Sequence, residues 1–293
     1  MCGMPQRRRL AVSSAVSLVN GGMPERPIGT VLKTVVCKHR GFESHSLRSL
    51  GPNASRGYRF AMSGRGTFYD YGSDIYTEAD GSDDTLANLG PLGPLAGIWT
   101  SAEGADVHPV GAGSDITGPV VDGDEHNVFV ERYELQPIDP QTNGPQLFYG
   151  LRYHTHIVKP GEVETFHDQV GYWLWEPAAR TVLHTLAIPR GQTLLALGTA
   201  EPDATEFEVS ATLGSEINGI LSNPFLDHAF QTVSFRMRVT VHGDGTWSYE
   251  EHTELRMPDR EGLVDHVDRN TLERIGDPVP NPLASVADRG QGA

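Results

Sequence analysis

The chain has 293 residues, and its charge is unevenly distributed. Residues 1–61 contain ten basic and two acidic residues, a net charge of +8, whereas residues 62–293 contain 13 basic and 36 acidic residues, a net charge of −23. The acidic body repels a phosphate backbone, which argues against nucleic acid as a partner. Both cysteines, Cys2 and Cys37, lie in the basic segment, which excludes a disulfide framework, an iron–sulfur cluster or thiolate-bound zinc from the body. No apolar run approaches the roughly 20 residues that span a bilayer, so we expect a soluble, cytoplasmic protein with no membrane partner.

Residues 1–61 are predicted to lie outside the folded domain. Three consecutive arginines, scattered serine and glycine, and no hydrophobic period are typical of a segment that cannot build a core. A transit peptide would share this composition. The run Gly41-Phe-Glu-Ser44 is also what the TΨC arm of a transfer-RNA gene encodes when it is read as codons, and Met62 follows shortly after it. We interpret the segment as disordered or not translated.

Residues 62–85 are acidic and rich in glycine and serine, a composition that predicts a flexible lead-in. Residues 86–95 carry leucines at near-helical spacing, interrupted by Gly-Pro pairs. This second pattern predicts one or two short helical turns that cap one end of the folded domain.

The rest of the chain alternates apolar and polar residues with the period of a β-strand. The alternation is clearest from Phe235 to Val241, and it resumes at Trp247 after the turn His242-Gly-Asp-Gly245, a strong hairpin signal. The runs predicted as strands are 96–103, 127–136, 146–158, 168–176, 180–188, 192–199, 205–212, 234–241, 247–257 and 264–274.

Ten short strands at hairpin spacing, with no long helices between them, predict an all-β fold. We expect a ten-stranded antiparallel up-and-down β-barrel of the lipocalin and fatty-acid-binding-protein kind over residues 86–276, followed by a flexible tail at 277–293. Residues 222–231 interrupt the pattern as a short helix or a loop. A barrel of this size can hold an internal ligand.

One histidine pair has the spacing of a metal site. His154 and His156, with Glu162 or Glu164, resemble the first metal-binding motif of cupins. The spacing to Glu162 is one residue too long, however, and no partner motif follows. The two histidines also share a strand face with Arg152, opposite the apolar face, which favours a solvated position. We therefore expect them to contribute little to cofactor binding and keep a cupin-like metal-dependent enzyme as a third hypothesis.

The remaining histidines and motifs are less informative. His108, His126, His242 and His252 fall in turns or on polar faces and are interpreted as ordinary surface residues. The body has no nucleophile elbow and no phosphate-binding glycine loop.

Four segments resemble the nitrobindins, the fatty-acid-binding-protein-like haem barrels. His167-Asp-Gln-Val-Gly-Tyr172 resembles their His-x-Glu-x-Gly-Tyr segment. The other three, in chain order, are Leu95-Ala-Gly-Ile-Trp99 at the family's Gly-x-Trp opening, Pro189-Arg-Gly191 with Leu195-Ala-Leu-Gly198 at its next hairpin, and Leu263-Val-Asp-His266 with Arg274 in its closing strand. The resemblance covers roughly residues 86–276.

Departures from the family pattern place the sequence in a divergent, bacterial-type branch. After Trp99 one glycine of the opening motif is lost and another is displaced, and Gln169 replaces a glutamate. One extra residue between His266 and Arg274 predicts a bulge or a change of register in the last strand.

The resemblance implies a barrel that holds one haem b per chain through a single histidine and leaves the other iron face open to small diatomic ligands. Family members bind nitric oxide and isomerise peroxynitrite to nitrate, so a haem-dependent peroxynitrite isomerase is the implied enzyme, although enzymatic activity stays open. The resemblance implies His266 as the iron ligand and His167 as the catalytic residue on the distal side. We add Leu255 and Met257 as residues that line the pocket.

The second hypothesis is a carrier of a lipid or another small apolar ligand, with the same barrel and no iron. Such a carrier has no need of an imidazole at position 266, whereas haem does. Under either hypothesis the expected partner is a small molecule, and the chain is expected to be a monomer or a homodimer.

Overall fold

The computed structural model describes residues 69–110 and 116–280. The predictions for residues 1–61, for the start of the lead-in and for most of the C-terminal tail lie outside the described residues. Within the described part, the elements in chain order are α1 (Thr85–Asn88), the 3-10 helix η1 (Gly90–Leu95), β1 (Gly97–Pro109), β2 (Val120–Val121), β3 (Asp124–Asn143), β4 (Gln146–Val158), β5 (Thr165–Glu176), β6 (Thr181–Ile188), β7 (Gln192–Thr199), β8 (Glu206–Thr212), β9 (Ile220–Ser222), α2 (Pro224–Ala229), β10 (Gln231–Val241), β11 (Trp247–Arg256) and β12 (Val264–Gly276). None of the described helices is long and apolar enough to cross a membrane.

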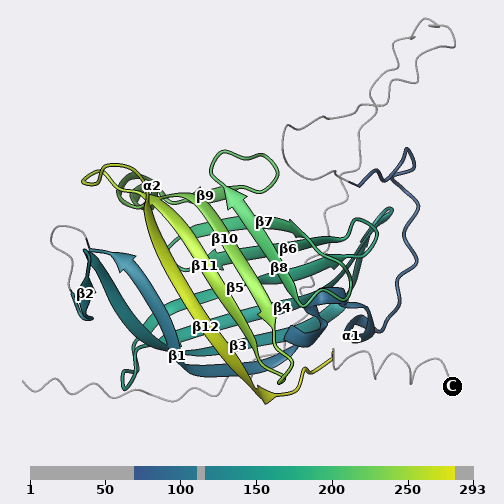
Figure 1. Cartoon of the computed structure of the whole chain (residues 1–293). Helices are drawn as coiled ribbons and strands as arrows, with labels where there is room; N and C mark the ends of the chain where they lie inside the picture. Colours follow the sequence, from purple (N-terminus) through teal and green to yellow (C-terminus); the bar gives the residue numbers. More distant parts are fainter. Residues whose placement is uncertain (1–68, 111–115, 281–293) are drawn as a thin grey trace, which may run out of the picture. The chain divides into compact units, whose positions relative to one another are not determined.

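Ten of these strands form one closed antiparallel barrel (Figure 1). From β3 to β12 the long strands pair in chain order, β10 following β8, and β1 closes the ring because it pairs with both β12 and β3. The short strands β2 and β9 add to β3 and β7 respectively. The predicted ten-stranded all-β fold is therefore confirmed.

The boundaries of most strands agree closely with the sequence pattern. The predicted hairpin around residues 242–245 is present, with Val241 of β10 paired to Trp247 of β11. The largest difference is in β3, which runs from Asp124 to Asn143 rather than over 127–136. The strand β1 is also longer than predicted, because it continues to Pro109 rather than ending near residue 103. This extension brings into the barrel wall a segment that the sequence pattern left as a loop.

One end of the barrel is closed by the two short helical segments α1 and η1. Leu89, Leu92 and Leu95 are fully buried there, as the predicted capping turns require. The indole nitrogen of Trp99 donates a hydrogen bond to the carbonyl of Leu95 (2.8 Å). The guanidinium of Arg274 lies over the Trp99 ring, 4.3 Å from its centroid. The apolar side chains and this cation–π contact seal the base of the barrel.

Residues 69–84 contact the barrel at several points. The hydroxyl of Tyr71 donates a hydrogen bond to Glu176, and the amide of Ala79 donates one to the carbonyl of Gly144 (2.9 Å). The flexibility expected for this lead-in stays a prediction.

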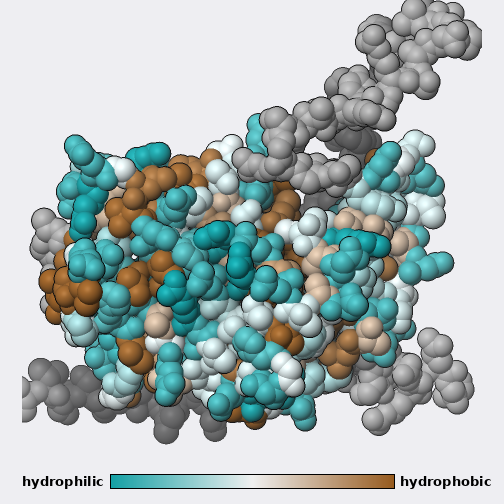
Figure 2. All heavy atoms as spheres, in the orientation of Figure 1, coloured by the Kyte–Doolittle hydropathy of each residue, from teal (hydrophilic) through white to brown (hydrophobic). Residues whose placement is uncertain are grey.

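The opposite end of the barrel carries α2, as Figure 1 shows. This six-residue helix is the predicted interruption between strands, and the side chain of Asn223 caps it by accepting hydrogen bonds from the amides of Phe225 (2.8 Å) and Leu226 (3.1 Å). Phe225 and Phe230 are largely exposed, and Figure 2 shows hydrophobic side chains gathered over this end. The two ends therefore differ: one is a packed base, and the other has an apolar rim.

Candidate functional site

The barrel contains a cavity of about 390 Å³ below α2. This volume lies within the range of small-molecule sites. Leu226 and Phe230, at either end of α2, reach its mouth. Apolar side chains line the part of the wall formed by β6, β7 and β10, mainly Leu186, Ile188, Leu194, Phe235 and Met237.

The wall near β12 is very different, because it carries carboxylates and imidazoles. The cavity-lining members are Asp106 and His108 of β1, Glu131 of β3, Glu251 of β11, and His266 and Asp268 of β12. They face the cavity together because alternate residues of each strand share a face and because β1, β11 and β12 are direct neighbours in the sheet.

His266 occupies the centre of this polar wall. Its Nε2 donates a hydrogen bond to Oδ1 of Asp106 (2.8 Å) and lies 3.3 Å from Oδ2 of Asp268. Burial opposes the protonation of His266, but the negative charges of Asp268 and Asp106 outweigh it and raise the pKa of the imidazole to about 9. Nδ1 has no hydrogen-bond partner among the described residues, so it is the ring nitrogen that can bind a ligand once it has lost the proton that the raised pKa keeps on the ring.

Asp106 and His108 were not singled out by the sequence pattern. Asp106 Oδ2 accepts a hydrogen bond from Nδ1 of His108 (3.0 Å), so this one carboxylate holds two imidazoles. Burial alone would raise the pKa of Asp106, but the hydrogen bonds from His108 and His266 hold it well below its usual range. The sequence analysis placed His108 in a turn or on a polar face, and the structure corrects this, since β1 carries it into the cavity.

A β-bulge explains why the pattern missed both residues. The pairing of β1 shifts register between Thr100 and Ala105 against β12, and between Ser101 and Gly104 against β3. One extra residue reverses the faces of a strand, so Asp106 points inward although it is an odd number of residues from the inward-facing Trp99. The sequence predicts a bulge or a change of register between His266 and Arg274. The β11–β12 pairing runs without a break from Val264 to Leu272, whereas the β1–β12 pairing changes register between Arg269 and Glu273, with the extra residue on β1.

Two further carboxylates are poorly neutralised. Glu251 and Asp268 lie opposite each other on β11 and β12, and burial raises the pKa of both. Glu251 has no hydrogen bond or ion pair to any described residue. Glu251 occupies an inward-facing position in the alternation of β11, but hydrophobic periodicity gives no reason to expect an acidic residue there.

Glu131 is the most deeply buried carboxylate of the wall, with 1% of its surface exposed. Its Oε2 accepts hydrogen bonds from Nδ2 of Asn270 (2.6 Å) and from the hydroxyl of Tyr249 (2.9 Å). Burial nevertheless raises its pKa to about 7. The fold therefore carries a carboxyl group that titrates near neutral pH inside the barrel.

His167 lies on β5, four strands from β12 around the ring. Its Nε2 donates a hydrogen bond to Oε1 of Gln169 (3.2 Å), and Nε2 of Gln169 donates in turn to the hydroxyl of Tyr153 (2.7 Å). Burial lowers the pKa of His167, so the ring is neutral at neutral pH. The glutamine that replaces the family's glutamate thus orients the histidine.

Leu255 and Met257, the two apolar residues assigned to the pocket, lie in different places in the structure. Leu255 lines the cavity. Met257 does not, because β11 ends at Arg256 and the chain then turns away. Met257 instead lines a shallow surface depression between α2 and the loop at residues 258–263.

Other histidines lie outside the cavity. His184 is fully buried and stacked on Trp173, with ring centroids 3.9 Å apart, and burial lowers its pKa to about 3. His154 and His156 lie on the outer face of β4, where they contact Asp168 and Thr165 respectively. This is the outward position that the strand parity predicts.

Asp265 also points outward, as its parity predicts, and Nδ1 of His252 donates a hydrogen bond to it (2.7 Å). It therefore cannot orient His266.

Comparison with known proteins gives one family. Residues 88–274 match the family described as "THAP4-like, heme-binding beta-barrel domain". No curated protein matches the chain. Among solved structures, the crystal structure of Rv2717c from M. tuberculosis is similar, with 17% sequence identity, a TM-score of 0.45, and coverage of 66% of this chain and 98% of that chain. Because the family match extends over more than half of the chain, and over the ten-stranded barrel described above, the protein belongs to the THAP4-like haem-binding β-barrel family.

Proposed function

We propose that the cavity binds one haem b and that His266 supplies the axial nitrogen. The observation that carries this proposal is the state of the imidazole: Nε2 is held by Asp106, while Nδ1 has no partner among the described residues. Histidines that ligate metals commonly donate their other ring N–H to a carboxylate or a carbonyl. Asp106 fills that role for His266.

The chemical types of the residues that line the cavity suit a haem. A porphyrin needs an extended apolar surface, and aliphatic and aromatic side chains of β6, β7 and β10 supply one. It also needs one ligating side chain, and His266 stands on the polar wall. The barrel is sealed at its base, so the group would reach the cavity from the α2 end.

Bound through one histidine, a haem supplies an iron with one open face, the arrangement required to bind nitric oxide or to isomerise peroxynitrite to nitrate. The role of the chain is to hold and screen that face. His167 is the residue we assign there, because it is neutral and fixed by Gln169. Its Nε2–H is committed to Gln169, so Nδ1 is the atom that can accept a hydrogen bond or a proton.

The proposal is tested by titrating the purified full-length chain with hemin. We expect a Soret band that saturates at one hemin per chain, and a shifted Soret band when nitric oxide is added to the reduced complex. The decay of peroxynitrite should be faster with the complex than with the same concentration of free hemin, with nitrate as the product. If no Soret shift develops and the chain instead binds a fluorescent fatty acid, the lipid-carrier hypothesis is correct.

Replacing His167 with leucine should leave haem bound but slow the decay of peroxynitrite. Leucine fills similar space and removes the only imidazole that we place on the distal side. General acid–base groups contribute about 10²–10⁴-fold to the reactions they assist, so we expect a loss of at least about tenfold in the decay rate. Hemin affinity should change by less than about threefold. An unchanged rate in His167→Leu would remove His167 from the mechanism without affecting the assignment of His266.

A further inference from the structure

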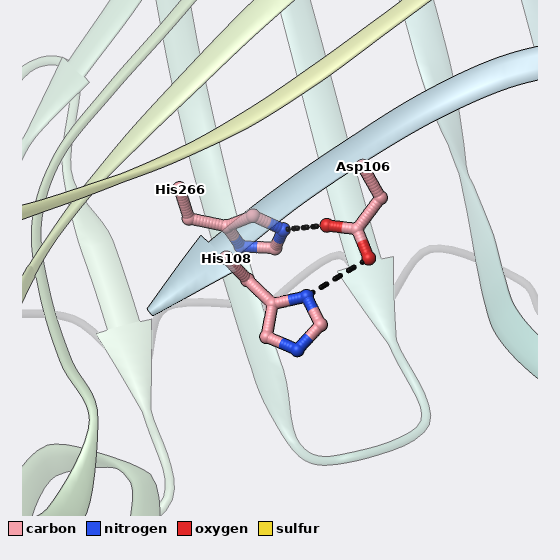
Figure 3. Close-up of side chains that lie close together, drawn as sticks. All are labelled: Asp106, His108 and His266. Atoms are coloured by element: carbon pink, nitrogen blue, oxygen red, sulfur yellow. Dashed lines mark hydrogen bonds and ion pairs between the residues drawn. The ribbon is translucent and has the colours of Figure 1, made fainter. Parts of the chain in front are cut away.

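The polar wall contains a cluster that the haem proposal does not use in full. Asp106 and His108 project from the same face of β1, two residues apart, and His266 projects from the neighbouring strand β12 (Figure 3). One donor atom from each of the three lies within 4.8 Å of the other two. The imidazole rings of His108 and His266 are 5.9 Å apart at their centroids. Two nitrogens and a carboxylate oxygen thus converge on one point at the edge of the cavity.

The surroundings of this cluster carry an excess of negative charge. Asp268 lies 3.3 Å from Nε2 of His266, and Oε2 of Glu125 lies 3.4 Å from Nε2 of His108. Glu251 faces the same cavity and has no partner among the described residues. A buried carboxyl group without a partner is unfavourable in its charged form, and a cation bound nearby would favour that form. This argument from charge is independent of the donor geometry, and both indicate a bound cation.

We propose that, in the haem-free barrel, Asp106, His108 and His266 bind one divalent transition-metal ion. Two imidazoles and one carboxylate form a donor set that suits Zn²⁺, Co²⁺ and Fe²⁺ rather than Mg²⁺ or Ca²⁺, which prefer oxygen ligands. Three protein ligands leave at least one coordination position for a further ligand. The open position would face the cavity.

This site goes beyond the proposed haem function, and the two share only His266. A haem and a metal ion at this cluster would both engage the same imidazole, so we expect them to compete. His108 is a ligand only in the metal proposal, and metal binding can be measured on the haem-free chain, so the two proposals are separable.

The test is a titration of the haem-free, full-length chain with Co²⁺, followed by visible absorption, and with Zn²⁺, followed by calorimetry. We expect one equivalent to bind with a Kd of about 1 μM or tighter and to produce the intense d–d bands of four- or five-coordinate Co²⁺. His108→Ala should weaken the binding of both ions at least 100-fold. His108→Asn, which keeps a polar side chain of similar size, should weaken the binding equally if the alanine variant folds poorly.

The matched control is the double variant His154→Ala, His156→Ala, which removes a pair of exposed histidines on the outer face of β4. This variant should retain the Co²⁺ spectrum. If it loses the spectrum while His108→Ala keeps it, the ion binds at the surface and the proposed site is wrong. If the chain binds Co²⁺ through His108 but never binds hemin, this proposal stands and the proposed haem function fails.

Discussion

Replacing His266 with alanine is expected to abolish axial ligation of haem and to weaken hemin binding by about 100-fold or more. His266 carries the only cavity-facing imidazole in the described residues whose Nε2 is held by a carboxylate and whose Nδ1 has no partner. Without the axial bond, the hydrophobic wall alone would hold the porphyrin. The Soret band should move toward that of unligated hemin, and external imidazole should partly restore the spectrum because the cavity vacated by the ring can admit it.

The double variant His154→Ala, His156→Ala is again the suitable control, because it removes two histidines without touching the cavity. The alanine at position 266 leaves Asp106 and Asp268 with less positive charge nearby, so the melting temperature of the haem-free variant must be measured alongside. An unchanged Soret band in His266→Ala would transfer the ligand assignment to His167. His184 is not an alternative, since it is packed against Trp173 and does not line the cavity.

Glu131→Gln is expected to stabilise the protein at alkaline pH and to have little effect in acid. The pKa of Glu131 is about 7 in the folded chain, against an unperturbed value of 4.5. Between these two pH values the folded state keeps a proton that the unfolded state releases, so the stability contributed by the protonated group is lost as the pH rises through that window. The full difference corresponds to about 3 kcal/mol above pH 8.

Glutamine suits this position because its amide oxygen can accept the hydrogen bonds that Asn270 and Tyr249 donate to the carboxylate. The measurement is urea unfolding at pH 5 and pH 8 for the wild type and the variant. Glu206→Gln, which makes the same change at an exposed residue of β8, is the control and should shift stability equally at both pH values. A stabilisation by Glu131→Gln that is independent of pH would show that the carboxylate is not the titrating group.

Much of the fold could be predicted because strand periodicity is a local property. On β4, the alternation alone separated the buried Leu151 and Tyr153 from the exposed Arg152 and His154. The Asp-Gly turn at residues 244–245 fixed the β10–β11 hairpin in the same way. These features depend only on neighbouring residues, so they can be read without knowledge of the rest of the chain.

The polar wall could be predicted only in part because it depends on contacts between distant residues. His266 came from the family resemblance, but its partner Asp106 is 160 residues away and follows a β-bulge. Nothing in the local pattern reveals that the segment from Ser101 to Gly104 contains an extra residue. Beyond that residue, the inward-facing positions of β1 have even rather than odd residue numbers. The carboxylate Glu251 shows a second limit, since hydrophobic periodicity gives no reason to expect a charge on an inward face.

The sealed base has a consequence for the order in which molecules move. Leu89, Leu92 and Leu95 leave no passage at that end, and Leu226 and Phe230 border the mouth at the other. The cavity therefore opens only at the α2 end, so the molecule that enters last must leave first. A small reactant that lies deeper than a larger bound molecule can exchange only when the larger one shifts aside. Release rates should thus depend on the opening of α2 and the stability of its Asn223 cap more than on the affinity of the inner wall.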